Sequence, residues 1–179
     1  DGEMGSKIIK KTPPFKEEDK KRKILAPFFT KFASPLIPSI FECLGYEMET
    51  LPVSDKESVN VGLTYSNNEI CFPATLVIGD IIKALKSGKY DLDKTAVIMT
   101  QTGGQCRASN YIALIRKAIL NSGIDNVPVV SFATGGSQDN EQPGFELAWT
   151  KVVKLILADA LFADVLSRMH YATIVREKV

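Results

Sequence analysis

The sequence has no marked excess of charge, few cysteines and no long apolar stretch. Its 179 residues contain 22 Lys and Arg against 21 Asp and Glu, so the net charge of +1 gives no reason to expect nucleic acid or an anionic membrane as partner. No run approaches the roughly 20 apolar residues that cross a bilayer, and no apolar core follows the polar amino end as in a signal peptide. These absences indicate a cytoplasmic protein.

Residues that support common chemistries are also scarce. Three cysteines, Cys43, Cys71 and Cys106, are too few and too far apart for a disulfide framework and suit free thiols or metal ligands in a reducing compartment. The single histidine, His170, is expected at a surface or interface rather than in a catalytic set. Neither GxGxxG nor GxxxxGK[ST] occurs, so the chain is not expected to hydrolyse ATP by itself.

The composition predicts a globular protein, with 45% hydrophobic and 24% charged residues. Residues 1–22 are charged, contain two adjacent prolines and lack an apolar face, so they are expected to form a flexible leader. Residues 23–179 are expected to form one α/β domain. The abrupt start at Asp1 and Gly2 suggests a fragment of a larger protein.

Strands and helices are expected to alternate along this domain. Apolar runs and alternating patterns predict strands at 24–29, 46–51, 95–99 and 127–132. Helical spacing predicts helices at 39–44 and 72–85, one that begins beside Cys106 and one or two more over 145–169, with a polar loop through 66–68. This order predicts a Rossmann-like α/β fold, a doubly wound and mainly parallel sheet flanked by helices.

Two cysteines take similar places in this scheme. Cys71 and Cys106 each follow a loop and open a predicted helix, where the helix dipole stabilises a thiolate. Such loops line the ligand crevice of an open α/β sheet, so the two thiols can converge on one site. From position alone, two buried and inert thiols remain the commoner outcome. Cys43 lies inside the first helix and is expected to be a small core residue.

Motifs around these cysteines extend the interpretation. They are YSNNEICFPA at 65–74, GDII at 79–82, KYD at 89–91 and QTGGQCRASNY at 101–111. In order and spacing the chain resembles the 2-hydroxyacyl-CoA dehydratase and activase-related proteins over roughly residues 23–170. It is most similar to the dehydratase-like portion of the large members, in which an activase-type ATPase region is joined to that portion.

The resemblance implies a [4Fe–4S] cluster held by cysteines, with Cys71 and Cys106 as metal ligands. Domains of this family accept an electron from an ATP-driven activase and use it in low-potential reductive chemistry, which in the characterised dehydratases removes water from a 2-hydroxyacyl-CoA. The implied partners are an activase-type ATPase region or subunit, neighbouring dehydratase-like domains and an acyl-CoA substrate. Because the family's clusters usually take three cysteines, another segment or subunit is expected to supply a further ligand.

Neighbouring residues suggest further cofactor contacts. Arg107 places a guanidinium beside Cys106, where it can stabilise a thiolate or an anionic cluster, although a solvated charge is the plainer interpretation. Gly103 and Gly104 permit close backbone approach with N–H groups directed at sulfur, although a simple turn explains them equally well. Tyr111 is expected to pack or cap.

Three hypotheses follow from the sequence. The first is an iron–sulfur domain that serves electron transfer or reductive dehydration within a dehydratase-like enzyme. The second is a non-catalytic assembly module in which Cys71 and Cys106 are buried and the long final helix docks neighbouring domains. The third is an iron-free domain that binds a nucleotide or CoA ester at the crevice.

Overall fold

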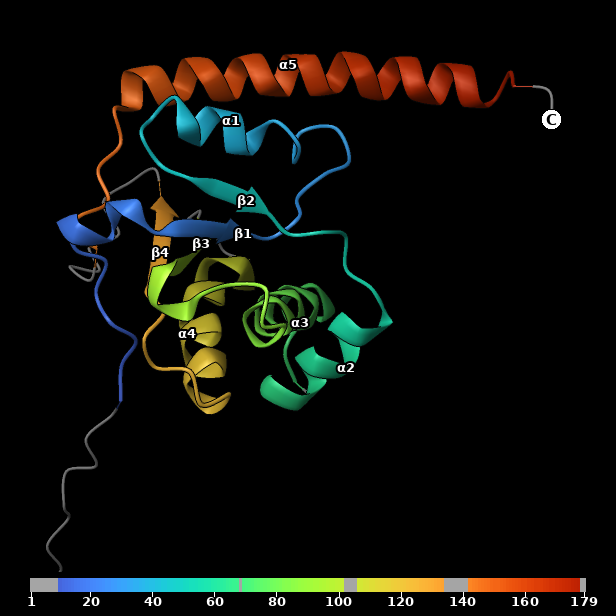
Figure 1. Ribbon diagram of the computed structural model, residues 1–179. Helices are drawn as coiled ribbons and strands as arrows, with labels where there is room; N and C mark the ends of the chain where they lie inside the picture. Colours follow the sequence, from blue (N-terminus) through green and yellow to red (C-terminus); the bar gives the residue numbers. More distant parts are fainter. Residues whose placement is uncertain (1–9, 68, 102–105, 134–141, 178–179) are drawn as a thin grey trace, which may run out of the picture.

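The fold is built on a four-stranded parallel sheet. The computed structural model describes residues 10–67, 69–101, 106–133 and 142–177. Within them the strands pair in the order β2-β1-β3-β4 (Figure 1). They are β1 (Lys23–Ala26), β2 (Met48–Thr50), β3 (Thr95–Gln101) and β4 (Val129–Ala133). The predicted α/β fold with a parallel sheet is therefore confirmed.

Helices connect the strands and cover both faces of the sheet (Figure 1). They are α1 (Ile37–Glu42) between β1 and β2, α2 (Lys56–Tyr65) and α3 (Phe72–Lys86) between β2 and β3, α4 (Tyr111–Asn121) between β3 and β4, and α5 (Trp149–Ile174) after β4. Short 3-10 helices are η1 (Glu17–Lys21), η2 (Leu92–Lys94) and η3 (Arg107–Asn110). None of the helices in the described residues is long and apolar enough to span a bilayer.

Successive strand residues supply two separate cores, because side chains along a strand alternate between its faces. Leu25 and Val97 pack with α3 and α4 through residues such as Ile115. Ile24 and Ala96, their immediate neighbours, pack on the opposite face with α1 and α5 and with a cluster of aromatic side chains. The runs of buried residues predicted for β1 and β3 thus reflect burial on both faces.

The chain winds in opposite directions from the centre of the sheet. From β1 it passes over one face through α1 to β2, and from β3 it passes over the other face through α4 to β4. In parallel sheets such a reversal places a crevice between the loops that follow the two central strands. This carboxyl edge of the sheet carries the loops that precede α3 and α4.

The crossing of α2 over α3 depends on small residues, and α2 was not predicted from the sequence. A Cβ atom on Gly62 would lie 2.1 Å from the carbonyl oxygen of Thr75, and one on Gly79 would lie 1.8 Å from that of Ser58. Both distances are far below any real contact, so only glycine permits this approach. Asp55 caps α2 by accepting a hydrogen bond of 2.8 Å from the Ser58 N–H.

The segment 12–22 is packed against the domain, in contrast to the flexible leader expected over 1–22. The Phe15 ring is fully buried and meets the Phe145 ring edge-on, with 6.1 Å between centroids. The Gly144 N–H donates a hydrogen bond of 2.9 Å to the Phe15 carbonyl. One large apolar residue therefore anchors a segment whose charge suggested disorder, while residues 1–9 lie outside the described part of the chain.

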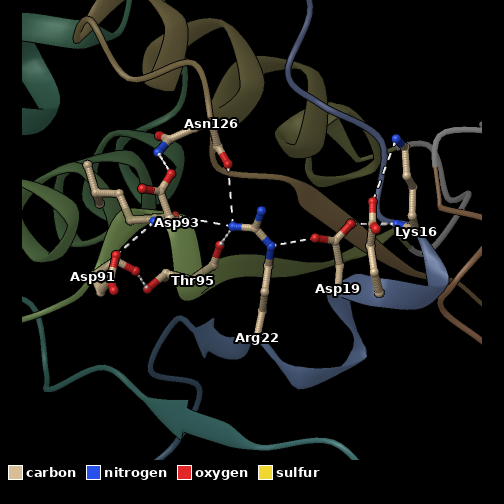
Figure 2. Close-up of polar contacts among 9 residues, drawn as sticks. Lys16, Asp19, Arg22, Asp91, Asp93, Thr95 and Asn126 are labelled. Atoms are coloured by element: carbon tan, nitrogen blue, oxygen red, sulfur yellow. Dashed lines mark hydrogen bonds and ion pairs between the residues drawn. The ribbon is translucent and has the colours of Figure 1, made fainter.

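Arg22 joins the segments that enter the strands, at the amino edge of the sheet (Figure 2). Its Nε donates a hydrogen bond of 2.5 Å to the Asp19 carboxylate. Its Nη1 donates to the backbone carbonyls of Leu92 and Thr95, at 3.2 and 3.1 Å, and of Asn126 at 3.5 Å. The Asp19 carboxylate in turn accepts from the Lys16 N–H at 2.7 Å. Both charged side chains are mostly buried, at 20% and 11% exposed.

Replacing Arg22 with methionine should strongly destabilise the fold. The substitution leaves the Asp19 charge buried without its partner and several carbonyls without a donor, which typically costs about 3–5 kcal/mol. Urea unfolding followed by circular dichroism measures the loss. Lys94→Met, which removes an exposed ion pair with Asp91, is the matched control and should change little. Equal effects of both substitutions would show that the Arg22 network has no special role.

Gly79→Ala should also destabilise the protein, although alanine is the better helix former. The new methyl group would collide with the Ser58 carbonyl, and such overpacking costs about 1–3 kcal/mol or more. Asn60→Ala, on the exposed side of α2, is the control and should be neutral or slightly stabilising. A gain in the free energy of unfolding for Gly79→Ala would contradict the close crossing.

Candidate functional site

Cys71 and Cys106 both lie at the carboxyl edge of the sheet. Cys71 is the N-cap of α3, with extended backbone angles (φ −65°, ψ 145°) and no side-chain capping hydrogen bond. Cys106 is the N-cap of η3, which leads directly into α4, and has almost the same angles (φ −70°, ψ 146°). Each cysteine therefore opens a helix, as the sequence predicted. Because α3 and α4 return the chain antiparallel to the strands, their amino ends lie at the same edge.

Tyr111, the first residue of α4, contacts Cys71 and follows Cys106 by five positions in the chain. Its hydroxyl lies 2.9 Å from the Cys71 Sγ, within hydrogen-bond distance, and only 7% of the residue is exposed. Burial first, then the hydrogen bond to Cys71 and the negative charges of Cys71 and Cys106, raise the pKa of the Tyr111 phenol to about 12. Tyr111 is therefore within electrostatic range of both cysteines, although these are 35 positions apart in the sequence.

A chain of polar contacts holds the start of α4 against the strand ends. The Gln101 side chain donates to the Ser109 carbonyl at 3.2 Å and accepts from the Ser131 hydroxyl at 2.9 Å. The Gln142 amide then binds both backbone groups of Ser131, accepting from its N–H at 2.6 Å and donating to its carbonyl at 2.9 Å. These contacts join β3, η3 and β4 around the Cys106 loop. The sequence does not predict these contacts, because they link residues up to 30 positions apart.

Cys43 is not part of this site. It is an exposed residue at the C-cap of α1, so the expectation that it would be a small core residue was wrong. Its helix packs on the opposite face of the sheet from α3 and α4, and its end of that helix points toward the amino edge. Cys43 is therefore placed too far away to share a ligand with Cys71.

The remaining predicted residues are only partly described. Gly103 and Gly104 lie outside the described residues, and so does the side chain of Arg107, whose backbone begins η3. His170 is half-buried on α5, where its Nε2 lies 3.2 Å from the Lys31 Nζ. Across the described parts of the chain, no group of three His, Cys, Asp or Glu side chains is placed to hold a metal ion.

The exposure of the two thiols bears on the hypothesis of a non-catalytic assembly module, the structural alternative. That alternative required Cys71 and Cys106 to be buried, whereas Cys71 is half-buried and Cys106 is exposed. Exposed thiols at helix starts are accessible to a ligand, a metal or an oxidant. Cys106 therefore departs from the structural alternative, whereas Cys71 packs in part against the core formed by α3 and α4.

A cavity of about 180 Å³ lies elsewhere, between α3 and the segment that follows β2. Its lining includes Leu51, Lys83 and the buried Asp80, which accepts a hydrogen bond of 2.6 Å from the Ser54 hydroxyl. Pockets that enclose organic ligands usually measure about 300–1,000 Å³. This cavity is too small for a nucleotide or CoA ester and contains neither cysteine.

Comparison of the chain with family models, with curated proteins and with solved structures found no match. The resemblance to dehydratase and activase-related proteins therefore depends on the motifs alone and stays a prediction.

The phenol of Tyr111 provides a direct test of the site geometry. We expect one tyrosine to titrate near pH 12, and Cys71→Ala to lower this pKa while burial still holds it above the ordinary value near 10. Because the folded state favours the neutral phenol, this group's contribution to stability is lost as the pH rises from about 10 to 12. Ultraviolet absorbance of the tyrosinate measures the titration, and Tyr111→Phe identifies its signal. An ordinary pKa for Tyr111 would contradict the buried contact.

Proposed function

We propose that this chain is an iron–sulfur cluster-binding domain of a 2-hydroxyacyl-CoA dehydratase-like or activase-related system, which takes part in low-potential electron transfer or reductive dehydration. Cys71 and Cys106 are its proposed cluster ligands. The observation that carries the proposal is the shared partner Tyr111, whose hydroxyl contacts one cysteine and whose pKa responds to both. The half-buried Cys71 thiol and the exposed Cys106 thiol near one buried phenol support a common site.

The donor chemistry fits an iron–sulfur cluster, but the number of donors does not complete one. Cysteine thiolates are the usual ligands of these clusters, and the amino end of a helix such as α3 favours an anionic group. Four thiolates commonly hold a [4Fe–4S] cluster, whereas the described residues place two here. The proposal therefore requires ligands from another segment or from a partner subunit, in line with the activase-type and dehydratase-like partners expected from the motifs.

The residues of this chain have separable roles in the proposed site. A bound cluster would supply one-electron reduction at low potential. Cys71 and Cys106 would hold it, and the Tyr111 hydroxyl would donate a hydrogen bond to the Cys71 sulfur, which orients the ligand and reduces the charge density on it. Gln101 would fix the start of the Cys106 helix through Ser109.

Anaerobic reconstitution with iron and sulfide tests the proposal. We expect bound iron with a thiolate-to-iron absorption band, and loss of most of both in Cys71→Ala and in Cys106→Ala. Cys43→Ala is the matched control, because Cys43 is exposed on the other face of the sheet, and it should retain the iron. Iron analysis with visible and electron paramagnetic resonance spectra provides the measurements.

Two results would contradict the proposal. One is retention of full iron content by both Cys71→Ala and Cys106→Ala, which would place the metal elsewhere. The other is absence of iron both in this chain and in a longer polypeptide that supplies further cysteines.

A further inference from the structure

The outer side of α5 is an apolar surface that none of the described elements covers. The helix spans 26 residues along one side of the molecule (Figure 1). Its inner side is formed by Val152 and Ala163, which are buried, and by half-buried residues between and beyond them. Its outer side exposes large apolar side chains to at least half of their area, at Val153, Leu157, Leu161, Phe162, Val165 and Met169.

This surface is at the upper end of the apolar area that a monomer exposes in one patch. The six side chains, 50–69% exposed, leave on the order of 500 Å² of apolar area, near the upper limit of the largest patch on an ordinary monomer. That is also a large share of the roughly 800 Å² that each partner contributes to a standard interface. In a surface helix the side that faces away from the core normally carries mostly polar and charged residues. The surface therefore indicates a docking partner.

We propose that the partner is a second copy of this chain, paired through α5 in antiparallel orientation. At 3.6 residues per turn, Leu157 and Leu161 lie side by side on the line directly opposite the half-buried Asp159. A twofold axis through this line places Leu157 against Leu161 of the second copy, with Val153 and Val165 at the two flanks of the contact. One apolar row thus meets itself in a closed, isologous contact.

Charge complementarity selects this orientation. In the same register Lys154 lies opposite Asp164 of the second copy, and symmetry repeats the pair. Arg168, which holds Asp164 at 2.8 Å within its own helix, lies opposite Thr150, so no like charges meet. In a parallel pair Lys154 would face Lys154.

Sedimentation velocity over a range from micromolar to near-millimolar protein tests the proposal. We expect a monomer–dimer equilibrium that Leu161→Glu abolishes, because the carboxylate would be buried on the twofold axis. Leu63→Glu is the matched control: Leu63 is 50% exposed on α2, remote from α5, and its replacement should leave the dimer intact. Circular dichroism verifies that both variants are folded.

Charge reversal tests the register itself. Lys154→Glu and Asp164→Lys should each raise the dimer dissociation constant about tenfold, since each converts two attractive pairs to repulsive ones. The double variant should recover most of the wild-type affinity. A monomer at every concentration would overturn the proposal, as would a dimer that Leu161→Glu leaves intact or that the double variant fails to restore. None of these outcomes depends on iron, so they are independent of the cluster proposal.

Discussion

The mostly buried guanidinium of Arg22, at the amino edge of the sheet, holds together the segments that lead into β1, β3 and β4. Arg22 immediately precedes β1 and binds carbonyls on the segments that enter β3 and β4, so three strands of a parallel sheet begin from one shared point. A charge with so little exposure to water is stable only when it is paired. Asp19, on η1, provides the pair and thereby ties η1 to the amino edge of the sheet. Once the amino ends are aligned, the register of the strands determines where their carboxyl ends lie.

The geometry of the proposed site depends on this alignment and on the packing of α3 and α4 in one core. Strand β3 ends at Gln101, whose side chain holds the start of α4 and therefore Tyr111. Helix α3 packs in the same core as α4 and carries Cys71 as its N-cap. The contact between the Cys71 sulfur and the Tyr111 hydroxyl thus connects the amino ends of two helices that pack in one core.

The sequence predicted those features that leave a local pattern. Unbroken apolar runs identified β3 and β4, and helical spacing identified α3 and most of α5. Helix α2 was missed because its buried face consists of Ser58 and Gly62, which carry no hydrophobic signal. Packing of Phe15, exposure of Cys43 and the role of Tyr111 depend on contacts between distant segments, which a local pattern does not encode. The motifs located both cysteines but gave no sign of their common partner.

The outer edge of β4 has a consequence for how this protein behaves at high concentration. Strand edges invite another chain to add a strand, and this is the usual route to aggregation through sheets. Here side chains occupy that edge: Gln142 binds both backbone groups of Ser131, and Arg116 donates to the Val129 carbonyl. The edge offers few free backbone groups as a template, so sheet growth on this side would first have to displace an amide and a guanidinium.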